Sequence, residues 1–379
     1  MAYHVLTHTF FPIVGGAEVG IHEIFKRFPV EPKVSIVTPI PAAGAGDFTA
    51  DDLTRDASYE VVRLRDTPRG DSVFAKVGDV LAWRQIRYLW RHRSTAKQDT
   101  VNLHYAFPHG FAAIAARLLG YRVVIALVGR TDVLSEIPWW MRAHAELALR
   151  AAHQVITISE FDTQRTRWSS RATVIPYGAD AAYFQAPDAR AVGELRASWD
   201  AEGRTVLLAV QRLAPVKAVD KVIEAVRVLA ADEPDRYRLV IVGRGSEMER
   251  LRRLAEGLEE TVRFVGYVSE EDLPAHYAAA DVFVSHSMYE TFGVMFAQAM
   301  ASGKPIVAAR TSCISEVVPH GEVGLLVEPG DTAGFAAAVS RITDDAALRD
   351  RLGAAGRARA EARYRWEDVA SAYETALRR

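Results

Sequence analysis

Two cationic side chains, Arg212 and Lys217, stand in the segment VQRLAPVK (residues 210–217). The apolar run at 206–210 is typical of a buried parallel strand, so both cations would lie in the loop at its carboxyl end. A guanidinium binds two oxygens at once and an ammonium acts as a point charge, so the pair suits a diphosphate. The alternative is a solvated loop that carries incidental charges.

A carboxylate, Glu290, stands in the segment YETFGV (residues 289–294). We expect a strand at 282–285 and a helix at 292–301, with Glu290 in the loop between them. Free N–H groups at the start of that helix favour an anion, and Gly293 allows close backbone approach. Glu290 would accept hydrogen bonds from sugar hydroxyls, and Gln298 could face the same ligand. Alternatively, Glu290 caps the helix and Gln298 lies on a solvated face.

A pair of glycines, Gly15 and Gly16, joins the first expected strand to the first helix in FPIVGGAE (residues 11–18). A glycine turn at a helix N-terminus is an approach site for phosphate or sugar. A tight turn without a ligand explains the same residues. A similar turn, VGRG (residues 242–245), is not a full dinucleotide-binding fingerprint.

Short apolar runs that alternate with helix-like stretches must position these loops. Strands are expected at 4–7, 34–38, 61–64, 101–103, 123–127 and 155–158, then at 206–210, 239–242, 262–265, 282–285, 305–308 and 324–327. Helices are expected at 219–231, 247–258 and 292–301, with a terminal amphipathic helix at 366–379. Such alternation predicts a parallel, doubly wound sheet in each half, with ligands at the carboxyl ends of the strands.

Length and composition constrain the number of domains and the class of protein. The 379 residues suggest two domains at roughly 150 residues each, and residues 176–190 read as the boundary. We expect an N-terminal domain at 1–180, a C-terminal domain at 190–360, and a helix at 361–379 that crosses back to the first domain. The formal net charge of −2 gives no reason to expect nucleic acid. With the single cysteine, and without a signal segment or a long apolar run, a soluble, cytoplasmic protein is expected.

Together these segments resemble the retaining glycosyltransferases of family four, which have the GT-B architecture of two Rossmann-like domains facing across a deep cleft. The resemblance covers nearly the whole chain. It rests on the order and spacing of FPIVGGAE (11–18), VITISEF (155–161), VIPYGAD (174–180), RLAPVKAVDKVIEA (212–225), LVIVGRGSEMERL (239–251) and the block at 262–307.

The resemblance implies roles for particular residues. Arg212 and Lys217 would hold the diphosphate of a nucleotide-sugar donor, and Glu290 would contact the transferred sugar. The other implied donor contacts are the backbone of Phe292, Gly293 and Val294, the base-side residues Tyr267 and Val268, and Gly15 and Gly16 from the opposite domain.

The resemblance also implies a metal-independent reaction with retention of the anomeric configuration. No Asp-x-Asp occurs in the chain, so no metal or other cofactor is expected. Cations and a helix N-terminus would neutralise the diphosphate instead. The leaving nucleoside diphosphate would take the proton of the acceptor hydroxyl, since the motifs offer one obvious carboxylate and not the pair that a glycosidase needs.

The chain departs from the family pattern at three places. Gln298 replaces a glutamate that holds the ribose hydroxyls, which removes the charge-assisted part of that contact. Val128 stands where many members have a histidine that faces the primary hydroxyl of the sugar. The segment TSCISE (residues 311–316) replaces a Gly-Gly, so that loop would be shaped differently.

Acceptor contacts are expected in the first half. Arg130 or Asp132 would substitute for the missing histidine, or the sugar differs at that hydroxyl. Glu18, His104 and His109 are further acceptor-side candidates. A structural hydrogen-bonding role is the alternative for each histidine.

A basic, aromatic segment at 83–93 is predicted to be a helix. Its ordinary interpretation is an amphipathic helix with Ile86, Leu89 and Trp90 packed inward. The alternative is peripheral contact with a membrane or a lipid acceptor. A segment at 41–57, rich in Gly, Ala and Asp, reads as a mobile loop.

Two functions compete with transfer. Gln298 and Val128 would fit an altered member that binds sugar nucleotides without transferring the sugar. A sugar-nucleotide epimerase on the same architecture is the third hypothesis.

Overall fold

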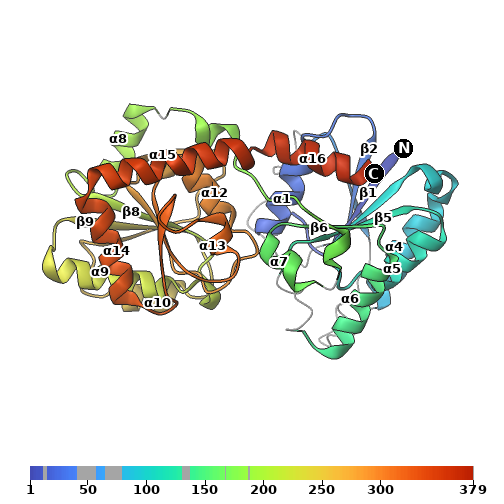
Figure 1. Cartoon of the computed structure of the whole chain (residues 1–379), viewed down its shortest axis with the longest axis horizontal. Coiled ribbons are helices and arrows are strands. Elements are labelled where there is room, and N and C mark those ends of the chain that lie inside the picture. The colour runs from blue at the N-terminus through green and yellow to red at the C-terminus, as the bar shows by residue number, and fades with distance from the viewer. Residues whose placement is uncertain are drawn as a thin grey trace. The chain divides into compact units, whose positions relative to one another are not determined.

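The computed structural model describes residues 1–11, 15–40, 57–64, 79–129, 137–166, 168–186 and 188–378, and the side chains of residues 79 and 80 are not described. The chain divides into two compact units, Met1–Tyr177 with Trp366–Arg379, and Gly178–Arg365. In each unit, helices cover a parallel sheet (Figure 1). All but the last residue of the expected loop at 41–57 fall outside the described residues.

The first unit is built on a parallel sheet with the strand order β3-β2-β1-β4-β5-β6-β7 among its described residues. Its strands are β1 (Ala2–Leu6), β2 (Lys33–Pro39), β3 (Glu60–Leu64), β4 (Thr100–His104), β5 (Arg122–Leu127), β6 (Gln154–Thr157) and β7 (Ala172–Val174). Its helices are α1 (Gly16–Phe25), α4 (Asp79–Arg91), η1 (Arg93–Gln98), α5 (Gly110–Leu118), α6 (Trp139–Ala151), α7 (Glu160–Arg165) and η3 (Ser169–Arg171).

The terminal helix α16 (Trp366–Arg378) also belongs to this unit and packs against α1 and β4. Its buried face includes Val369, Tyr373 and Leu377. The Tyr373 hydroxyl donates to Asn102 Oδ1 at 3.0 Å, and the Leu377 carbonyl accepts from Thr100 Oγ1 at 3.2 Å. The last segment of the chain therefore completes the core of the first unit.

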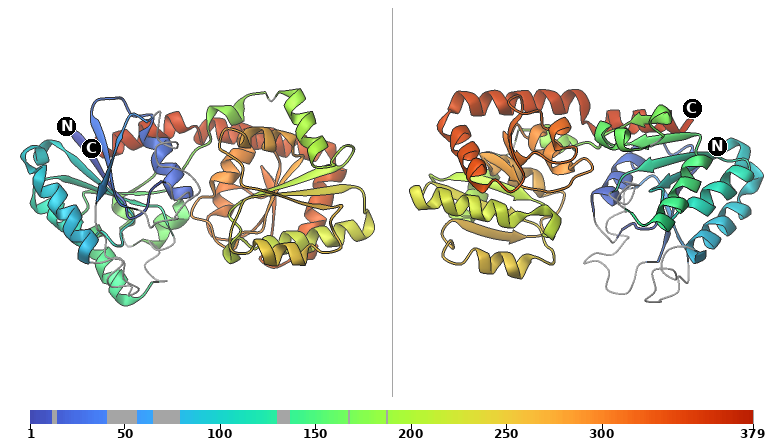
Figure 2. Two further views of the ribbon diagram at one scale, coloured as in Figure 1. Left: turned by 180° about the vertical axis from the view of Figure 1, so that it is seen from behind. Right: turned by 60° about the horizontal axis from the view of Figure 1, so that its bottom comes forward.

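The second unit is built on a parallel sheet with the order β10-β9-β8-β11-β12-β13 among its described residues, seen from two further sides in Figure 2. Its strands are β8 (Thr205–Val210), β9 (Tyr237–Val242), β10 (Val262–Gly266), β11 (Val282–Ser285), β12 (Ile306–Ala309) and β13 (Gly324–Val327). Its helices are η4 (Ala181–Phe184), α8 (Ala189–Ser198), η5 (Pro215–Lys217), α9 (Val219–Asp232), α10 (Met248–Leu254), α11 (Leu273–Ala279), α12 (Val294–Ala301), α13 (Ile314–Val317), α14 (Thr332–Asp344) and α15 (Ala346–Arg363).

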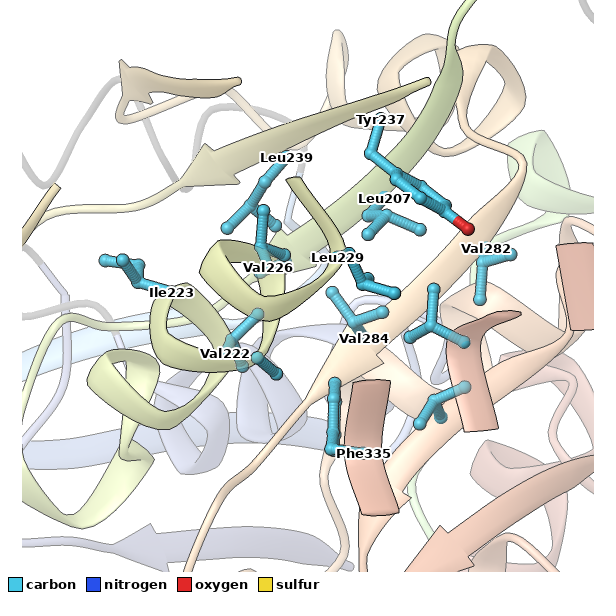
Figure 3. Packing of buried hydrophobic residues seen from close by; sticks show 14 of the residues in the cluster. Leu207, Val222, Ile223, Val226, Leu229, Tyr237, Leu239, Val282, Val284 and Phe335 are labelled. Atoms are coloured by element: carbon cyan, nitrogen blue, oxygen red, sulfur yellow. The ribbon is translucent and has the colours of Figure 1, made fainter. Parts of the chain in front are cut away.

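Helix α9 anchors the loop that carries the two cations. Its apolar residues recur at helical spacing and face strand residues such as Leu239 and Val284, together with Phe335 of α14 (Figure 3). Val222 and Ile223 have no exposed surface. Burying each such side chain contributes about 1.5–3 kcal/mol. The start of α9, directly after Lys217, is therefore held firmly against the sheet.

The doubly wound prediction is confirmed, and each predicted strand exists within a few residues of its expected ends. The short edge strand β7 was not predicted. The helix expected at 247–258 is shorter, Met248–Leu254, and the one expected from Phe292 begins at Val294. These two helices are trimmed because Gly257 and Gly293 adopt positive φ of 78° just outside them.

The inward packing expected for Trp90 on α4 is wrong. Trp90 is 55% exposed, while Leu89 is fully buried. Tyr88 and Leu89 fill the inner face of the helix, and Trp90 lies one position further round. Arg93 stacks over its ring at 4.3 Å.

Candidate functional site

The cation loop and the Glu290 loop follow adjacent strands of the second sheet. Strand β8 lies centrally, with β9 and β10 on one side and β11, β12 and β13 on the other. The chain order therefore reverses between β8 and β11, and a crevice opens at such a switch point at the carboxyl ends of the strands. Arg212 and Lys217 follow β8, and Glu290 follows β11.

Two glycines of the neighbouring β9–α10 loop allow the backbone of the loop that carries Arg212 and Lys217 to approach closely. A Cβ on Gly243 would lie 2.0 Å from the Gln211 carbonyl oxygen, and one on Gly245 would lie 2.1 Å from that of Leu213. The Leu213 N–H donates to the Arg244 carbonyl at 2.8 Å. These glycines are thus required by close backbone contact, which fixes the loop on one side.

Lys217 and Glu290 meet directly. Lys217 Nζ donates to Glu290 Oε1 at 2.5 Å, with side chains 17% and 8% exposed. The Met288 N–H also donates to the Val216 carbonyl at 2.9 Å, so the two loops are joined by backbone as well. The structure therefore brings together two of the three residues predicted to be catalytic.

Arg212 lies in the same loop after β8 as Lys217 and is exposed. Within the described part of the chain, its guanidinium makes no hydrogen bond or ion pair. Its five N–H donors are therefore available to an anion that approaches the switch point.

A third loop, after β12, holds Glu290 from the other side. The Glu290 N–H donates to Ser312 Oγ at 2.9 Å, and Cys313 Sγ donates to the Glu290 carbonyl at 3.2 Å. Thr311 Oγ1 donates to the Ser287 carbonyl at 2.8 Å. In the sequence, this segment stands out only as a departure from a Gly-Gly. The hydroxyl and thiol that brace Glu290 were missed.

Ser312 keeps the left-handed backbone for which glycine is best suited, with φ of 41°. A serine there strains the backbone, and its hydroxyl contributes the hydrogen bond to Glu290. The chain thus has, in place of a flexible residue, one that holds the backbone of Glu290.

The N-terminus of α12 completes the predicted donor side. Gly293 has φ of 78°, and a Cβ there would lie 2.7 Å from the Phe296 ring, so a larger residue is excluded. The Phe292 side chain is buried against the Tyr364 ring at 5.3 Å. Phe292 and Val294 can therefore offer backbone groups to a ligand, as expected of them.

Gln298 is 7% exposed, and its Oε1 accepts from the buried Tyr277 hydroxyl at 3.0 Å. One lone pair of the carbonyl oxygen is engaged by Tyr277, and the amide nitrogen can act as a donor. Tyr267 and Val268 are half-buried after Gly266, which has φ of 86°. Burial raises the pKa of Tyr267.

In the first unit, Glu18 is a brace within its own loop. It is 7% exposed, and its Oε1 accepts from Thr9 Oγ1. A Cβ on Gly15 would lie 2.6 Å from Glu18 Oε2, whereas a Cβ on Gly16 would meet open space. The carboxylate proposed for an acceptor is engaged inside the protein, so the acceptor role expected of Glu18 is not supported by its geometry. Gly16 remains approachable.

The two candidate histidines are also inside. His104 is fully buried, and its Nε2 lies 2.9 Å from Asn102 Oδ1 and 3.2 Å from the Tyr373 hydroxyl. Burial lowers the pKa of His104 to about 3. Contact with an acceptor would require exposed ring atoms, so this geometry favours the structural role.

His109 is likewise fully buried, with Nδ1 3.1 Å from Gln85 Oε1, and burial holds its pKa well below the ordinary value. Arg130 and Asp132 lie outside the described residues. A histidine that the sequence reasoning missed, His8, follows β1 with its ring 4.5 Å from that of Tyr105. Burial lowers the pKa of His8 to about 4. Its place just after the first strand was the available signal.

Within the described ranges there is no group of three or more His, Cys, Asp or Glu side chains that could hold a metal ion. Over the same ranges, no helix combines the length and apolar character that crossing a bilayer requires.

Two family descriptions match the chain. Residues 14–183 match Glycosyltransferase Family 4, and residues 193–359 match Glycosyl transferases group 1. The GDP-mannose-dependent alpha-(1-6)-phosphatidylinositol monomannoside mannosyltransferase of Mycolicibacterium smegmatis is 31% identical over 71% of this chain and 73% of its own length. The protein of the same description from Mycobacterium tuberculosis is 29% identical over 99% of this chain and 97% of its own.

Solved structures share the fold. The Anabaena protein HepE in complex with UDP superposes with a TM-score of 0.81 at 22% identity, covering 100% of this chain and 99% of HepE. The glycosyltransferase WaaG, involved in lipopolysaccharide biosynthesis, has a TM-score of 0.75 at 17% identity, covering 99% of this chain and 98% of WaaG. With the family matches and the loops at the switch point, these likenesses show that the chain belongs to the family 4 glycosyltransferases, has the GT-B fold and uses a nucleotide sugar as donor.

Proposed function

We propose that the chain is a retaining, metal-independent hexosyltransferase whose donor site is the switch point of the second unit. The observation that carries this proposal is the Lys217–Glu290 pair at 2.5 Å beside the exposed Arg212. Arg212 and Lys217 would bind the diphosphate oxygens, and the first N–H groups of α12 would add partial positive charge.

Glu290 would orient the sugar. Its Oε1 is held by Lys217, which leaves Oε2 to accept from sugar hydroxyls. Its backbone is held by Ser312 and Cys313. A carboxylate placed this rigidly can favour the transition-state position of the sugar over others.

In the proposed reaction the bond between the anomeric carbon and the diphosphate oxygen breaks. A bond from the same carbon to the acceptor oxygen forms on the same face. The acceptor hydroxyl proton passes to the leaving diphosphate oxygen. Diphosphate charge that develops in this step is stabilised by Arg212, Lys217 and the helix N-terminus, without a metal.

Gln298 would contact the ribose as a donor. Because its Oε1 accepts from Tyr277, its Nε2 is the group that would donate to the ribose. A ribose hydroxyl would then accept a hydrogen bond where a glutamate would accept one from it. Binding survives this reversal, so the exchange does not argue for an inactive protein.

The relatives suggest which substrates to try first. Those from mycobacteria are named for GDP-mannose and a phosphatidylinositol mannoside, and one from Nocardioides is named a D-inositol 3-phosphate glycosyltransferase. We propose a nucleoside diphosphate hexose, with GDP-mannose as the first donor, and an inositol-containing acceptor.

The test is donor turnover in the presence of EDTA, with the product anomer read by NMR. The proposal predicts equal amounts of nucleoside diphosphate and glycosylated acceptor, with the anomeric configuration of the donor kept. Inversion, or activity lost with EDTA and restored by Mg²⁺, would refute it. Donor isomerisation without an acceptor would instead indicate an epimerase, and donor binding without turnover would indicate the altered, binding-only member.

A further inference from the structure

A buried amide side chain, Gln211, stands between the end of β8 and the exposed Arg212. It is 8% exposed, and its Oε1 accepts a hydrogen bond from Ser285 Oγ at 3.0 Å. Ser285 is the last residue of β11, the strand that pairs with β8 on this side. The amide of Gln211 therefore spans the ends of the two strands that flank the switch point.

The surroundings of Gln211 hold it in place. The Ser287 N–H donates to Ser285 Oγ at 3.4 Å, and the Ser285 hydroxyl donates its single hydrogen to Gln211. The Gln211 N–H donates to the Val242 carbonyl at 3.1 Å, and the Cα of Gly243 packs closely against the Gln211 carbonyl. Because backbone and side chain are both held, the position of the amide is defined before any ligand binds.

The nitrogen of this amide has no protein partner. Gln211 Nε2 is buried and makes no hydrogen bond within the described part of the chain. An amide nitrogen carries two N–H donors, and buried donors in native proteins are nearly always satisfied. Leaving such donors unsatisfied is unfavourable, so an acceptor that enters the switch point would stabilise the complex.

A diphosphate is the acceptor that suits this position. Gln211 directly precedes Arg212, and Lys217 lies in the same loop. Phosphate oxygens only accept hydrogen bonds, and bonds to a charged acceptor are stronger than bonds to a neutral one. The two cations would supply charge, and the amide would supply an uncharged donor whose geometry is already set. Less conformational entropy is lost when a group that is already held binds a ligand.

We propose that Gln211 is a further donor-binding residue, whose Nε2 donates to a diphosphate oxygen of the nucleotide sugar. This inference rests on the proposed function and adds a residue that neither its charge nor its exposure would mark as a binding group.

The test measures binding of GDP, with UDP as the second probe, to the full chain by calorimetry. Gln211→Glu keeps an oxygen that can accept from Ser285 and replaces the amide nitrogen by a carboxylate oxygen. Gln211→Met keeps the length of the side chain without a hydrogen-bond donor. Thermal unfolding shows whether each variant is folded.

Gln85→Glu and Gln85→Met are the matched controls in the first unit. Gln85 is also buried, and its Oε1 lies 3.1 Å from His109 Nδ1. Its Nε2 likewise has no hydrogen-bond partner among the described residues. The controls therefore make the same chemical changes at a similar amide in the other unit.

Whichever nucleotide the wild type binds should bind at least about tenfold more weakly to both Gln211 variants, because a hydrogen bond to a charged group is lost. The Gln85 variants should bind it as the wild type does. Wild-type affinity in Gln211→Met overturns the inference even where Gln211→Glu binds weakly, because a carboxylate repels a diphosphate without touching it.

If Gln211→Met does not fold, wild-type affinity in Gln211→Glu is the contradicting result. A wild-type protein that binds neither GDP nor UDP would overturn the proposed function and this inference with it. Binding that is lost in Lys217→Ala but kept in both Gln211 variants would overturn this inference alone.

Discussion

The two units use polar residues at the carboxyl ends of their strands in opposite ways. In the second unit, Lys217 and Glu290 keep 17% and 8% of their side chains exposed, contact each other and are held by neighbouring loops, with the exposed Arg212 in the same loop as Lys217. In the first unit, His104 and His109 are fully buried and bonded inward. The same position in a doubly wound sheet therefore does not give the same role. The contact between Lys217 and Glu290 and the exposure of Arg212 distinguish the binding loops from the structural ones.

Glu290→Ala removes the carboxylate that the second unit is proposed to present to the sugar. We expect transfer to fall by about 10²- to 10³-fold, the usual loss when a preorganised group that stabilises a transition state is removed. Binding of the nucleoside diphosphate, measured by calorimetry, should stay largely intact. If nucleotide binding disappears as well, Glu290 supports the fold or the phosphate site instead of the sugar. Glu224→Ala, in another Lys–Glu pair on α9, is the control.

Lys217→Ala should weaken binding of the nucleoside diphosphate by about 10- to 100-fold, because a hydrogen bond to a charged group contributes about 1.5–3 kcal/mol. Lys221→Ala, whose ammonium pairs with Glu224 at 2.8 Å, should leave that affinity unchanged. Calorimetry compares the two variants. Unchanged affinity in Lys217→Ala would remove the phosphate role from this loop.

The buried His104 predicts a loss of stability in acid. Its folded-state pKa of about 3 lies below the ordinary 6.5, so the unfolded chain binds the proton first as the pH falls. The contribution of neutral His104 to the free energy of unfolding is full above pH 6.5 and is lost progressively between pH 6.5 and about pH 3. At pH 5 the loss is about 2 kcal/mol. Urea unfolding at pH 7 and pH 5 measures it.

Between pH 7 and pH 5, the free energy of unfolding of His104→Gln should fall by about 2 kcal/mol less than that of the wild type. Tyr373→Phe removes a hydrogen bond to the same network without removing the histidine, so it should keep the wild-type pH dependence. Identical pH dependence in all three proteins would contradict a buried, neutral His104. A large fall in transfer activity by His104→Gln without a stability change would restore its acceptor role.

The smallest expected effect concerns Ser312. Ser312→Ala removes the hydrogen bond to the Glu290 N–H but keeps the strained backbone, so kcat should fall about 2- to 10-fold, from about 0.5–1.5 kcal/mol. Ser312→Gly relieves the strain and should be the more stable of the two variants. Ser315→Ala, at an exposed site nearby, should behave as the wild type. If kcat is unchanged in Ser312→Ala, the hydroxyl does not position Glu290.

The sequence predicted the sheets well because their strands are apolar on both faces, as buried parallel strands must be. It missed β7 because Ala172–Val174 is short and its middle residue, Thr173, is exposed. The Arg212, Lys217 and Glu290 loops were found from strand–loop–helix order. The contact between Lys217 and Glu290 follows from the adjacency of β8 and β11, which the linear order of strands does not state.

Other features depended on packing between distant segments. The burial of His104 is decided by Tyr373, which comes from the opposite end of the chain. The hydrogen bond from the Glu290 N–H to Ser312 depends on a positive φ at Ser312, which the residue type does not predict. A cavity lined by arginines of β3 and α4 joins two segments whose contact the linear order of the chain does not state.

The switch point of the second unit is proposed to hold the diphosphate of the donor. A crystal structure of the chain with bound GDP tests it most directly, with UDP as the second ligand. We expect diphosphate oxygens within about 3 Å of the Arg212 guanidinium and Lys217 Nζ, near the first N–H groups of α12. A well-ordered diphosphate bound elsewhere, with Arg212 and Lys217 unengaged, would contradict it.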